Sequence, residues 1–265
     1  MKLDYLLNLL ENEKPLDHIV EDGGYCSIFD TIGCIGDSLS SGEFECKKNE
    51  NFTTYHDMFN YSWGQFIARD AGVKVYNFSR GGMRAKEYMQ SFGESIDAFN
   101  PEKKCKAYII ALGVNDLFNS PTPITVGGLD DLENNIESFS YYYQKIITTY
   151  KEIEPNAKFF LMTFPDQDDS TDYRRGLRLS HREFLYDLSK KYKNTYVLDF
   201  FKYAPKYDKD FERRFFLHGH LNPMGYKLTG KMVESYIDYI VRSDFESFKQ
   251  VGFIGTPQYD EKLDK

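Results

Sequence analysis

The chain has 265 residues, of which 41% are hydrophobic and 17% aromatic, and its formal net charge at pH 7 is −8. This composition can bury the core of one large α/β domain and argues against global disorder. The negative charge disfavours a nucleic-acid binder and a polybasic membrane anchor, because both need clustered Lys and Arg.

The first fourteen residues, MKLDYLLNLLENEK, predict a short amphipathic helix. Asp4, Asn8 and Glu11 interrupt its apolar positions, whereas a signal peptide needs an unbroken apolar stretch. No later stretch approaches the roughly 20 apolar residues of a membrane span, so no membrane partner is expected. The cysteines and histidines show no zinc spacing, so we expect reduced thiols, no metal and a cytoplasmic location.

Five short apolar runs predict the strands of a sheet. They are Phe29–Ile35, Val73–Phe78, Ala107–Leu112, Phe159–Thr163 and Tyr196–Leu198. Four of the runs are nearly continuous in apolar residues, which is typical of parallel strands buried on both faces. Longer helical patterns lie between them, and this alternation predicts a doubly wound α/β fold.

Apolar residues at steps of three and four predict the intervening helices. Their faces are Trp63 to Ile67, Leu132 through Ile136 and Phe139 to Tyr150, Leu179 to Tyr192, and Leu228 to Ile240. Asn222-Pro223 opens the last helix with a capping residue and a first-turn proline.

The absence of repeats and low-complexity linkers favours a single domain over residues 1–265, with its core between about residues 15 and 245. Residues 1–14 form the N-terminal helix, and residues 246–265 form a C-terminal tail. Phe248, Val251, Phe253 and Ile254 make the middle of this tail apolar enough to dock on the core, whereas its last residues are expected to fray. The oligomeric state stays open.

Polar segments follow the predicted strands on the edge of the sheet where α/β proteins bind their ligands. GDSLS follows the first strand, NFSRGG ends the second, GVND follows the third, and HGHLNPMGY precedes the last helix. Each segment alone reads as ordinary capping or turn chemistry. Together they supply a hydroxyl, a backbone N–H, an amide and an imidazole, which is the set that acyl transfer needs.

In this order the four segments resemble the SGNH (GDSL-type) hydrolase superfamily of esterases and lipases, and the resemblance covers most of the chain. It implies that Ser38 is the nucleophile and His220 the general base. It also implies an oxyanion hole made of the Ser38 N–H, the Gly82 N–H and the Asn115 amide. The implied fold is a flavodoxin-like three-layer α/β/α sandwich with a five-stranded parallel sheet of order 2-1-3-4-5. No cofactor is implied.

One position departs from the pattern of the family. Leu217 stands three residues before His220, where the family usually carries its catalytic acid. The main-chain carbonyl of Leu217 and the carboxylate of Asp199, which follows the fifth strand, are the two candidates for orienting the histidine. His218 is a rival base, but the His-x-Asn-Pro-x-Gly register selects His220.

Two long connections are candidates for the walls of the site, because both leave the sheet on the same edge. The first carries Tyr55 and His56 and leads to Trp63; the second carries Tyr173 among acidic residues and arginines. These side chains suit a polar alcohol or a sugar ring, although ordinary solvated loops are the alternative. With the small esters that the resemblance implies, they predict a small-molecule substrate: a short acyl ester, acetyl above all, of a polar or carbohydrate alcohol.

Three other interpretations compete with this one. An α/β-hydrolase would carry G-x-S-x-G, but Ser40 replaces the last glycine here. A flavodoxin-like flavin binder could use GDSLSSG as its phosphate loop, yet it would leave Asn115 and His220 without a role. A catalytically weak or inactive binding module on the same fold is favoured by Leu217 alone.

Overall fold

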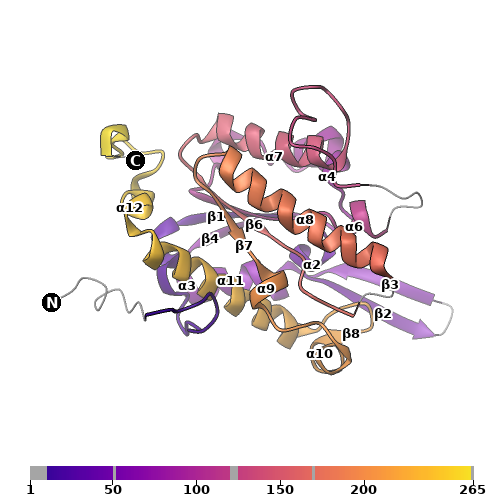
Figure 1. Cartoon of the computed structure of the whole chain (residues 1–265). Helices are drawn as coiled ribbons and strands as arrows, with labels where there is room; N and C mark the ends of the chain where they lie inside the picture. Colours follow the sequence, from indigo (N-terminus) through magenta and orange to yellow (C-terminus); the bar gives the residue numbers. More distant parts are fainter. Residues whose placement is uncertain (1–10, 50–51, 120–124, 169–170, 264–265) are drawn as a thin grey trace.

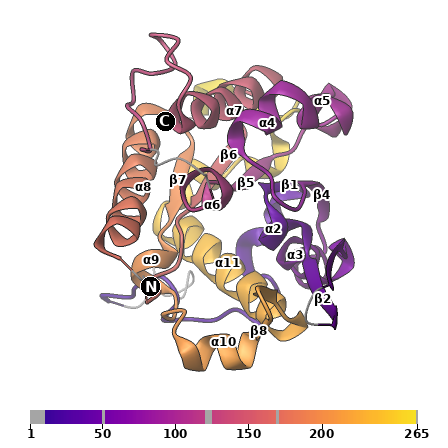
Figure 2. The same cartoon turned by 90° about the vertical axis from the view of Figure 1, so that its right-hand side faces the viewer.

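The computed structural model describes residues 11–49, 52–119, 125–168 and 171–263. A five-stranded, all-parallel sheet lies in the centre, and helices cover both of its faces (Figures 1 and 2). The predicted three-layer α/β/α sandwich is confirmed. Most of the predicted N-terminal helix lies outside the described residues, and residues 11–14 begin with a turn and are not helical.

The sheet contains strands β4, β1, β5, β6 and β7 in that spatial order. Their bounds are β1 Thr31–Gly36, β4 Lys74–Ser79, β5 Ala107–Ala111, β6 Lys158–Met162 and β7 Thr195–Leu198. Counted within this sheet alone, the order is 2-1-3-4-5. The strand labels differ from the predicted numbers because two strands that the sequence analysis missed, β2 and β3, follow β1 in the chain.

Each face of the sheet has its own hydrophobic core, because neighbouring residues of a strand point to opposite faces. Ile35 and Ile110 pack on one side, whereas Ile32 and Ile109 pack on the other. The first core lies under α4 Ala85–Glu87, α7 Phe139–Ile153 and α8 Asp172–Lys191. The second lies under α3 Trp63–Ala71 and α11 Pro223–Ser243.

Side-chain caps set the starts of the long helices. Asn222 precedes α11, and its side-chain oxygen accepts a hydrogen bond from the Gly225 N–H at 2.9 Å, with Pro223 as the first helical residue. This matches the predicted cap and proline. Ser62 caps α3 in the same way, accepting from the Gln65 N–H at 3.1 Å.

The helix α7 is shorter than the apolar pattern predicted. Leu132 lies in a turn and Ile136 in the irregular segment after it, and the helix begins only at Phe139. Asn135 adopts a left-handed backbone conformation with φ of 54°, and Ser138 then caps the helix. The left-handed residue breaks the helical path, so the apolar spacing before Ser138 does not reflect a continuous helix.

The connection after the first strand is a β-hairpin and not an irregular loop. β2 Glu43–Asn49 pairs with β3 Phe52–Asp57 in antiparallel register, and the pair projects from the body of the molecule (Figure 1). A second pair, β8 Phe216–Leu217 and β9 His220–Leu221, lies before α11. The remaining helices are short: α2 Ser38–Ser41, α5 Gly93–Ser95, α6 Val114–Leu117, α9 Phe200–Tyr203, α10 Lys209–Phe215 and α12 Phe245–Phe248.

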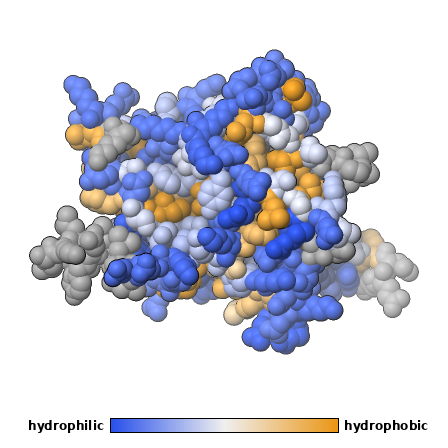
Figure 3. Space-filling model, in the orientation of Figure 1, coloured by the Kyte–Doolittle hydropathy of each residue, from blue (hydrophilic) through white to orange (hydrophobic). Residues whose placement is uncertain are grey.

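The C-terminal tail packs into the second core. Phe248, Val251 and Ile254 are buried there, whereas Phe253 is exposed. Hydrophilic side chains cover much of the face seen in Figure 3, and apolar ones gather in smaller patches. Within the described ranges, no helix combines the length and the apolar character that crossing a bilayer requires.

Candidate active site

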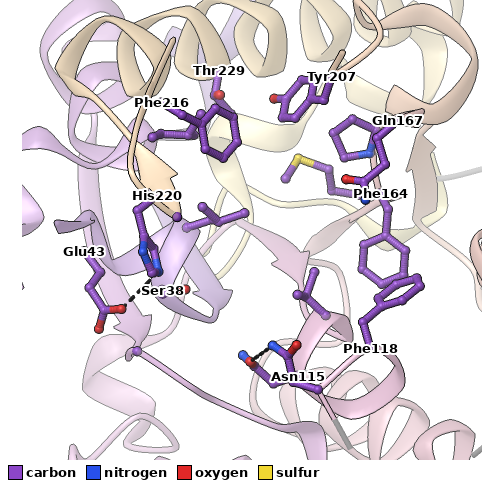
Figure 4. Close-up of a pocket in the computed structure, with 18 of the residues that line it drawn as sticks. Ser38, Glu43, Asn115, Phe118, Phe164, Gln167, Tyr207, Phe216, His220 and Thr229 are labelled. Atoms are coloured by element: carbon purple, nitrogen blue, oxygen red, sulfur yellow. Dashed lines mark hydrogen bonds and ion pairs between the residues drawn. The ribbon is translucent and has the colours of Figure 1, made fainter. Parts of the chain in front are cut away.

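A cavity of about 620 Å³ opens at the carboxyl edge of the sheet (Figure 4). Loops that leave β1, β4 and β5 reach it, as does the β9 strand. The polar residues that line it are Ser38, Glu43, Tyr55, Asn115, Asn119, Gln167, Arg174, Arg178, Tyr207, His220 and Thr229. Four of the predicted site residues (Ser38, Gly82, Asn115 and His220) therefore come from separate parts of the chain to one cavity.

Ser38 is half-buried at the start of α2, directly after β1. Asp37 caps this helix, and its Oδ1 accepts a hydrogen bond from the Leu39 N–H at 3.1 Å. The first turn of α2 thereby holds the Ser38 side chain at the cavity, with its own N–H among the helix-terminal groups that lack helical partners. Burial raises the pKa of Asp37 to about 7.

Two further hydrogen-bond donors face the same cavity. Gly82 follows β4 with a left-handed backbone, φ of 70°, which places its N–H without a side chain in the way. Asn115 lies on α6 after β5, where its Nδ2 donates to the Met83 carbonyl at 3.2 Å. Its Oδ1 accepts from Asn119 Nδ2 at 2.8 Å. Because Nδ2 carries two hydrogens, the second one remains for a ligand.

His220 reaches the cavity from β9, and Figure 4 shows its ring between Glu43 and Ser38. Its Nε2 lies 3.1 Å from Glu43 Oε1, and its Nδ1 lies 3.8 Å from Glu45 Oε2. The ring of Tyr55 packs against the imidazole edge-on, with the centroids 5.8 Å apart. Burial lowers the pKa of His220, against the opposing effects of Glu45 and Asp57. The imidazole is therefore neutral at pH 7 and can accept a proton.

Neither predicted orienting group holds the histidine in the structure. His220 Nδ1 is buried and has no hydrogen-bond partner among the described residues, so the Leu217 carbonyl does not accept from it, although the two residues are paired across β8 and β9. Asp199 is fully buried at the start of α9, where Arg182 Nη2 lies 2.7 Å from its Oδ2 and Tyr186 donates to it. These partners make Asp199 a structural carboxylate.

Two of the four side chains predicted to form the walls of the site reach the cavity. Tyr55 and Trp63 line it, whereas His56 and Tyr173 are exposed outside it. His56 follows Tyr55 on a strand and therefore points to the opposite face, where its Nε2 lies 3.0 Å from Thr54 Oγ1. The rival base His218 is also exposed and lies outside the cavity.

Three charged residues of the site were not predicted: Glu43 and Glu45, which sit two apart on β2, and Arg178. Arg178 lies four residues after Arg174 on α8, and Arg174 is one of the arginines expected in the second connection. These spacings place each pair on one face of its element. The alternation in Glu43-Phe44-Glu45 was the signal for the first pair, but it needed the hairpin to be recognised. Among the described residues, no group of three or more His, Cys, Asp or Glu side chains is placed to hold a metal ion.

The chain matches a known protein family over most of its length. A model of the GDSL-like Lipase/Acylhydrolase family matches residues 34–228. The sequence matches no curated protein significantly.

Solved structures share the fold at low sequence identity. A family two carbohydrate esterase from Clostridium thermocellum, in complex with cellohexaose, has a TM-score of 0.58 and 15% identity, with 88% of this chain and 67% of that chain covered. A carbohydrate esterase family 2 enzyme from Corynascus thermopiles (Myceliophthora fergusii), which includes a carbohydrate binding domain, has a TM-score of 0.56 and 15% identity, with 80% and 66% covered. At this identity the two likenesses establish the fold alone.

Proposed function

The chain belongs to the GDSL-like lipase/acylhydrolase family and is a serine esterase, and on this premise we propose that Ser38 is its nucleophile and His220 its general base. The observation that carries the proposal is the cavity into which Ser38, Gly82, Asn115 and His220 converge. A nucleophile, two kinds of oxyanion donor and a base within one cavity are the parts of an acyl-transfer site.

In the proposed reaction, His220 Nε2 takes the Ser38 proton as Oγ attacks the ester carbonyl. The negative charge on the carbonyl oxygen is stabilised by the N–H groups of Ser38 and Gly82 and by the free Nδ2 hydrogen of Asn115. His220 then protonates the leaving alcohol, and a water molecule repeats the sequence on the acyl-enzyme. Because burial lowers its pKa below the ordinary value, His220 is neutral at pH 7 and able to act as a base.

We propose that the substrate is a short acyl ester, above all an acetyl ester, of a polar or carbohydrate alcohol. The polar rim of the cavity supports this, since Asn119, Gln167 and Arg174 offer hydrogen bonds to hydroxyl groups. Trp63 also lines the cavity, and its buried Nε1 has no partner among the described residues. The two carbohydrate esterases of the same fold are consistent with this choice.

A longer acyl chain is the second candidate, favoured by the apolar part of the cavity wall. The apolar side chains that contribute to the wall are Phe118, Met162, Phe164, Phe200, Phe216 and Leu221. Figure 4 shows Phe118 and Phe164 close together on one side of the cavity. Burial of a longer alkyl chain against these side chains would contribute about 0.8 kcal/mol for each CH₂ group.

The nucleophile is tested with a fluorophosphonate probe, which should label the wild type and not Ser38→Ala. Labelling of another serine, or full esterase activity in Ser38→Ala, would contradict the assignment. A wild type that is neither labelled nor active would favour the binding-module alternative, and yellow purified protein would favour the flavin binder.

The acyl group is tested with 4-nitrophenyl esters from acetyl to decanoyl. The proposal expects kcat/KM to be highest for acetyl and to fall with chain length. A maximum at octanoyl or longer would select the apolar-wall candidate. Acetylated xylose and cellobiose then test the alcohol: release of acetate supports the carbohydrate, and activity on aryl acetates alone contradicts it.

A further inference from the structure

Within the described part of the chain, one ring nitrogen of His220 lacks the hydrogen-bond acceptor that would orient the imidazole. Its Nδ1 is buried and has no hydrogen-bond partner among the described residues. A general base of this kind is normally oriented by an acceptor at Nδ1, which also stabilises the imidazolium that forms during the reaction. Leu217 cannot provide a carboxylate, and Asp199 is engaged with Arg182.

The β2–β3 hairpin brings a carboxylate to this nitrogen. Glu45 Oε2 lies 3.8 Å from Nδ1, and the side chain of Glu45 is only 9% exposed. Its cross-strand partner is Tyr55, whose ring packs on the imidazole. On the opposite face of the strand, Phe44 packs against the ring of Tyr226 and anchors β2 to α11. The hairpin thus holds one face against the histidine.

Glu45 is fixed and charged. Its Oε2 accepts a hydrogen bond from the Gly219 N–H at 2.8 Å, which ties it to the residue before His220. Burial acts to raise the pKa of Glu45, but the Gly219 N–H and the Lys47 ammonium outweigh it, so that the pKa lies below its ordinary value. An ionised carboxylate therefore lies beside Nδ1 at neutral pH.

We propose that Glu45 is the positioning carboxylate of His220, supplied by the hairpin in place of the acid that the family usually carries three residues before the histidine. This inference rests on the proposed function of Ser38 and His220. As Ser38 gives its proton to Nε2, the Nδ1–H of the imidazolium donates to Glu45, and no proton passes to the carboxylate. The separation of 3.8 Å shortens when the substrate is bound, as catalytic hydrogen bonds of free enzymes often do.

Glu43 has a different place on the same face of β2. It meets Nε2, the nitrogen that must accept the Ser38 proton, and its Oε2 occupies the space where a side chain at Gly81 would begin. Burial and the nearby carboxylates of Asp57 and Glu45 raise the pKa of Glu43 to about 6. Because it occupies the reacting nitrogen, Glu43 must withdraw before catalysis and cannot orient the ring through Nδ1.

The test is Glu45→Gln, which keeps the shape and an oxygen for the Gly219 N–H but removes the charge. With 4-nitrophenyl acetate we expect kcat/KM to fall about 10²-fold or more, since Asp→Asn in a serine-protease triad costs about 10⁴. The acidic limb of the pH profile should also move to lower pH, because the carboxylate raises the pKa of His220. Glu45→Asp should have a rate and an acidic limb that lie between those of the wild type and of Glu45→Gln.

The groups that face the ring, and so contribute to that limb, are Glu43 and Glu45 from β2, Tyr55 and Asp57 from β3, and Ser38 from α2. Glu152→Gln is the matched control, because it makes the same substitution at an exposed position of α7 that does not line the cavity. It should keep the wild-type rate and limb.

Three outcomes would overturn the proposal: a Glu45→Gln rate within about threefold of wild type, a loss of rate without a shift of the limb, or a larger loss and shift in Glu43→Gln. If Glu45→Gln does not fold, Glu45→Asp decides by the same two readouts. Fluorophosphonate labelling separates this inference from the proposed function. Labelling at Ser38, together with a wild-type rate in Glu45→Gln, rejects this inference alone. Labelling at another serine rejects the proposed function.

Discussion

Asn115 presents its amide to the cavity in an orientation fixed by Met83 and Asn119. Preorganised donors of this kind act mainly in the transition state, so Asn115→Ala should lower kcat by about 10²–10³ with little change in KM. Steady-state kinetics on an aryl acetate measure this. Asn119→Ala removes the bond that orients this amide but leaves the amide itself in place, so it should lower kcat less. A near-wild-type kcat in Asn115→Ala would reduce Asn115 to a turn residue.

Asp37 should make the stability of the protein depend on pH. Burial raises its pKa from 3.8 to about 7, so between these values the folded state holds a proton that the unfolded state has lost. Its contribution is therefore greatest below pH 4 and falls as the pH rises to 7, by roughly 4 kcal/mol at most. Asp37→Asn cannot titrate but can still accept from the Leu39 N–H. Its free energy of unfolding, measured from pH 5 to 8, should fall less with pH than that of the wild type; equal slopes would contradict this.

Only some residues of the site could be predicted from the sequence. The residues directly after the parallel strands, such as Ser38 and Asn115, could be predicted because the strand ends fix their place. Glu45 could not, since its contact with His220 joins two segments far apart in the chain. His56 was misplaced by a single residue, because one step along a strand reverses the direction of a side chain.

At the scale of elements, the apolar runs predicted all five strands of the sheet to within two residues of their bounds. Parallel strands buried on both faces have a strong apolar signature, which the hairpin lacks. Its β3 strand is largely exposed, so no core pattern marked it. The predicted start of α7 was too early for another reason. The apolar spacing extends by chance into the residues before Ser138, which is the residue that caps the helix.

Two helix caps should have different consequences for activity. Asn222 lies two residues after His220 and caps α11. Its Nδ2 also donates a hydrogen bond to the Arg214 carbonyl at 2.8 Å. Ser138 caps α7 and does not line the cavity. Each change to Ala should lower the free energy of unfolding by about 0.5–2 kcal/mol. Only Asn222→Ala should also lower kcat/KM, by about tenfold or more, because small displacements of catalytic groups are costly.

Chemical denaturation and kinetics on the same two samples measure both quantities. Equal losses of activity in the two variants would mean that helix stability, and not the position of His220, limits the rate.

At the scale of the whole molecule, the C-terminal tail completes the core of one face of the sheet. Phe248 packs against Tyr196 at 5.1 Å, Phe29 at 6.2 Å and Phe160 at 6.5 Å between ring centroids. These partners come from β6, β7 and the segment before β1, so the tail packs on the sheet and on the segment that leads into it. We therefore predict that the tail unfolds together with the domain.

Phe248→Ala should test this directly, with Phe253→Ala as its matched control in the same tail. Phe248 is 2% exposed and Phe253 is 49% exposed. Replacing a buried Phe with Ala lowers the free energy of unfolding by about 3–5 kcal/mol, whereas substitutions at exposed positions usually change it by about 0.5 kcal/mol or less. Denaturant unfolding followed by tryptophan fluorescence reports on the same core, because Trp63 lies in it. A single transition that shifts only in Phe248→Ala supports one cooperative unit. Equal shifts in both variants, or a separate early transition, would mean that the tail folds independently of the sheet.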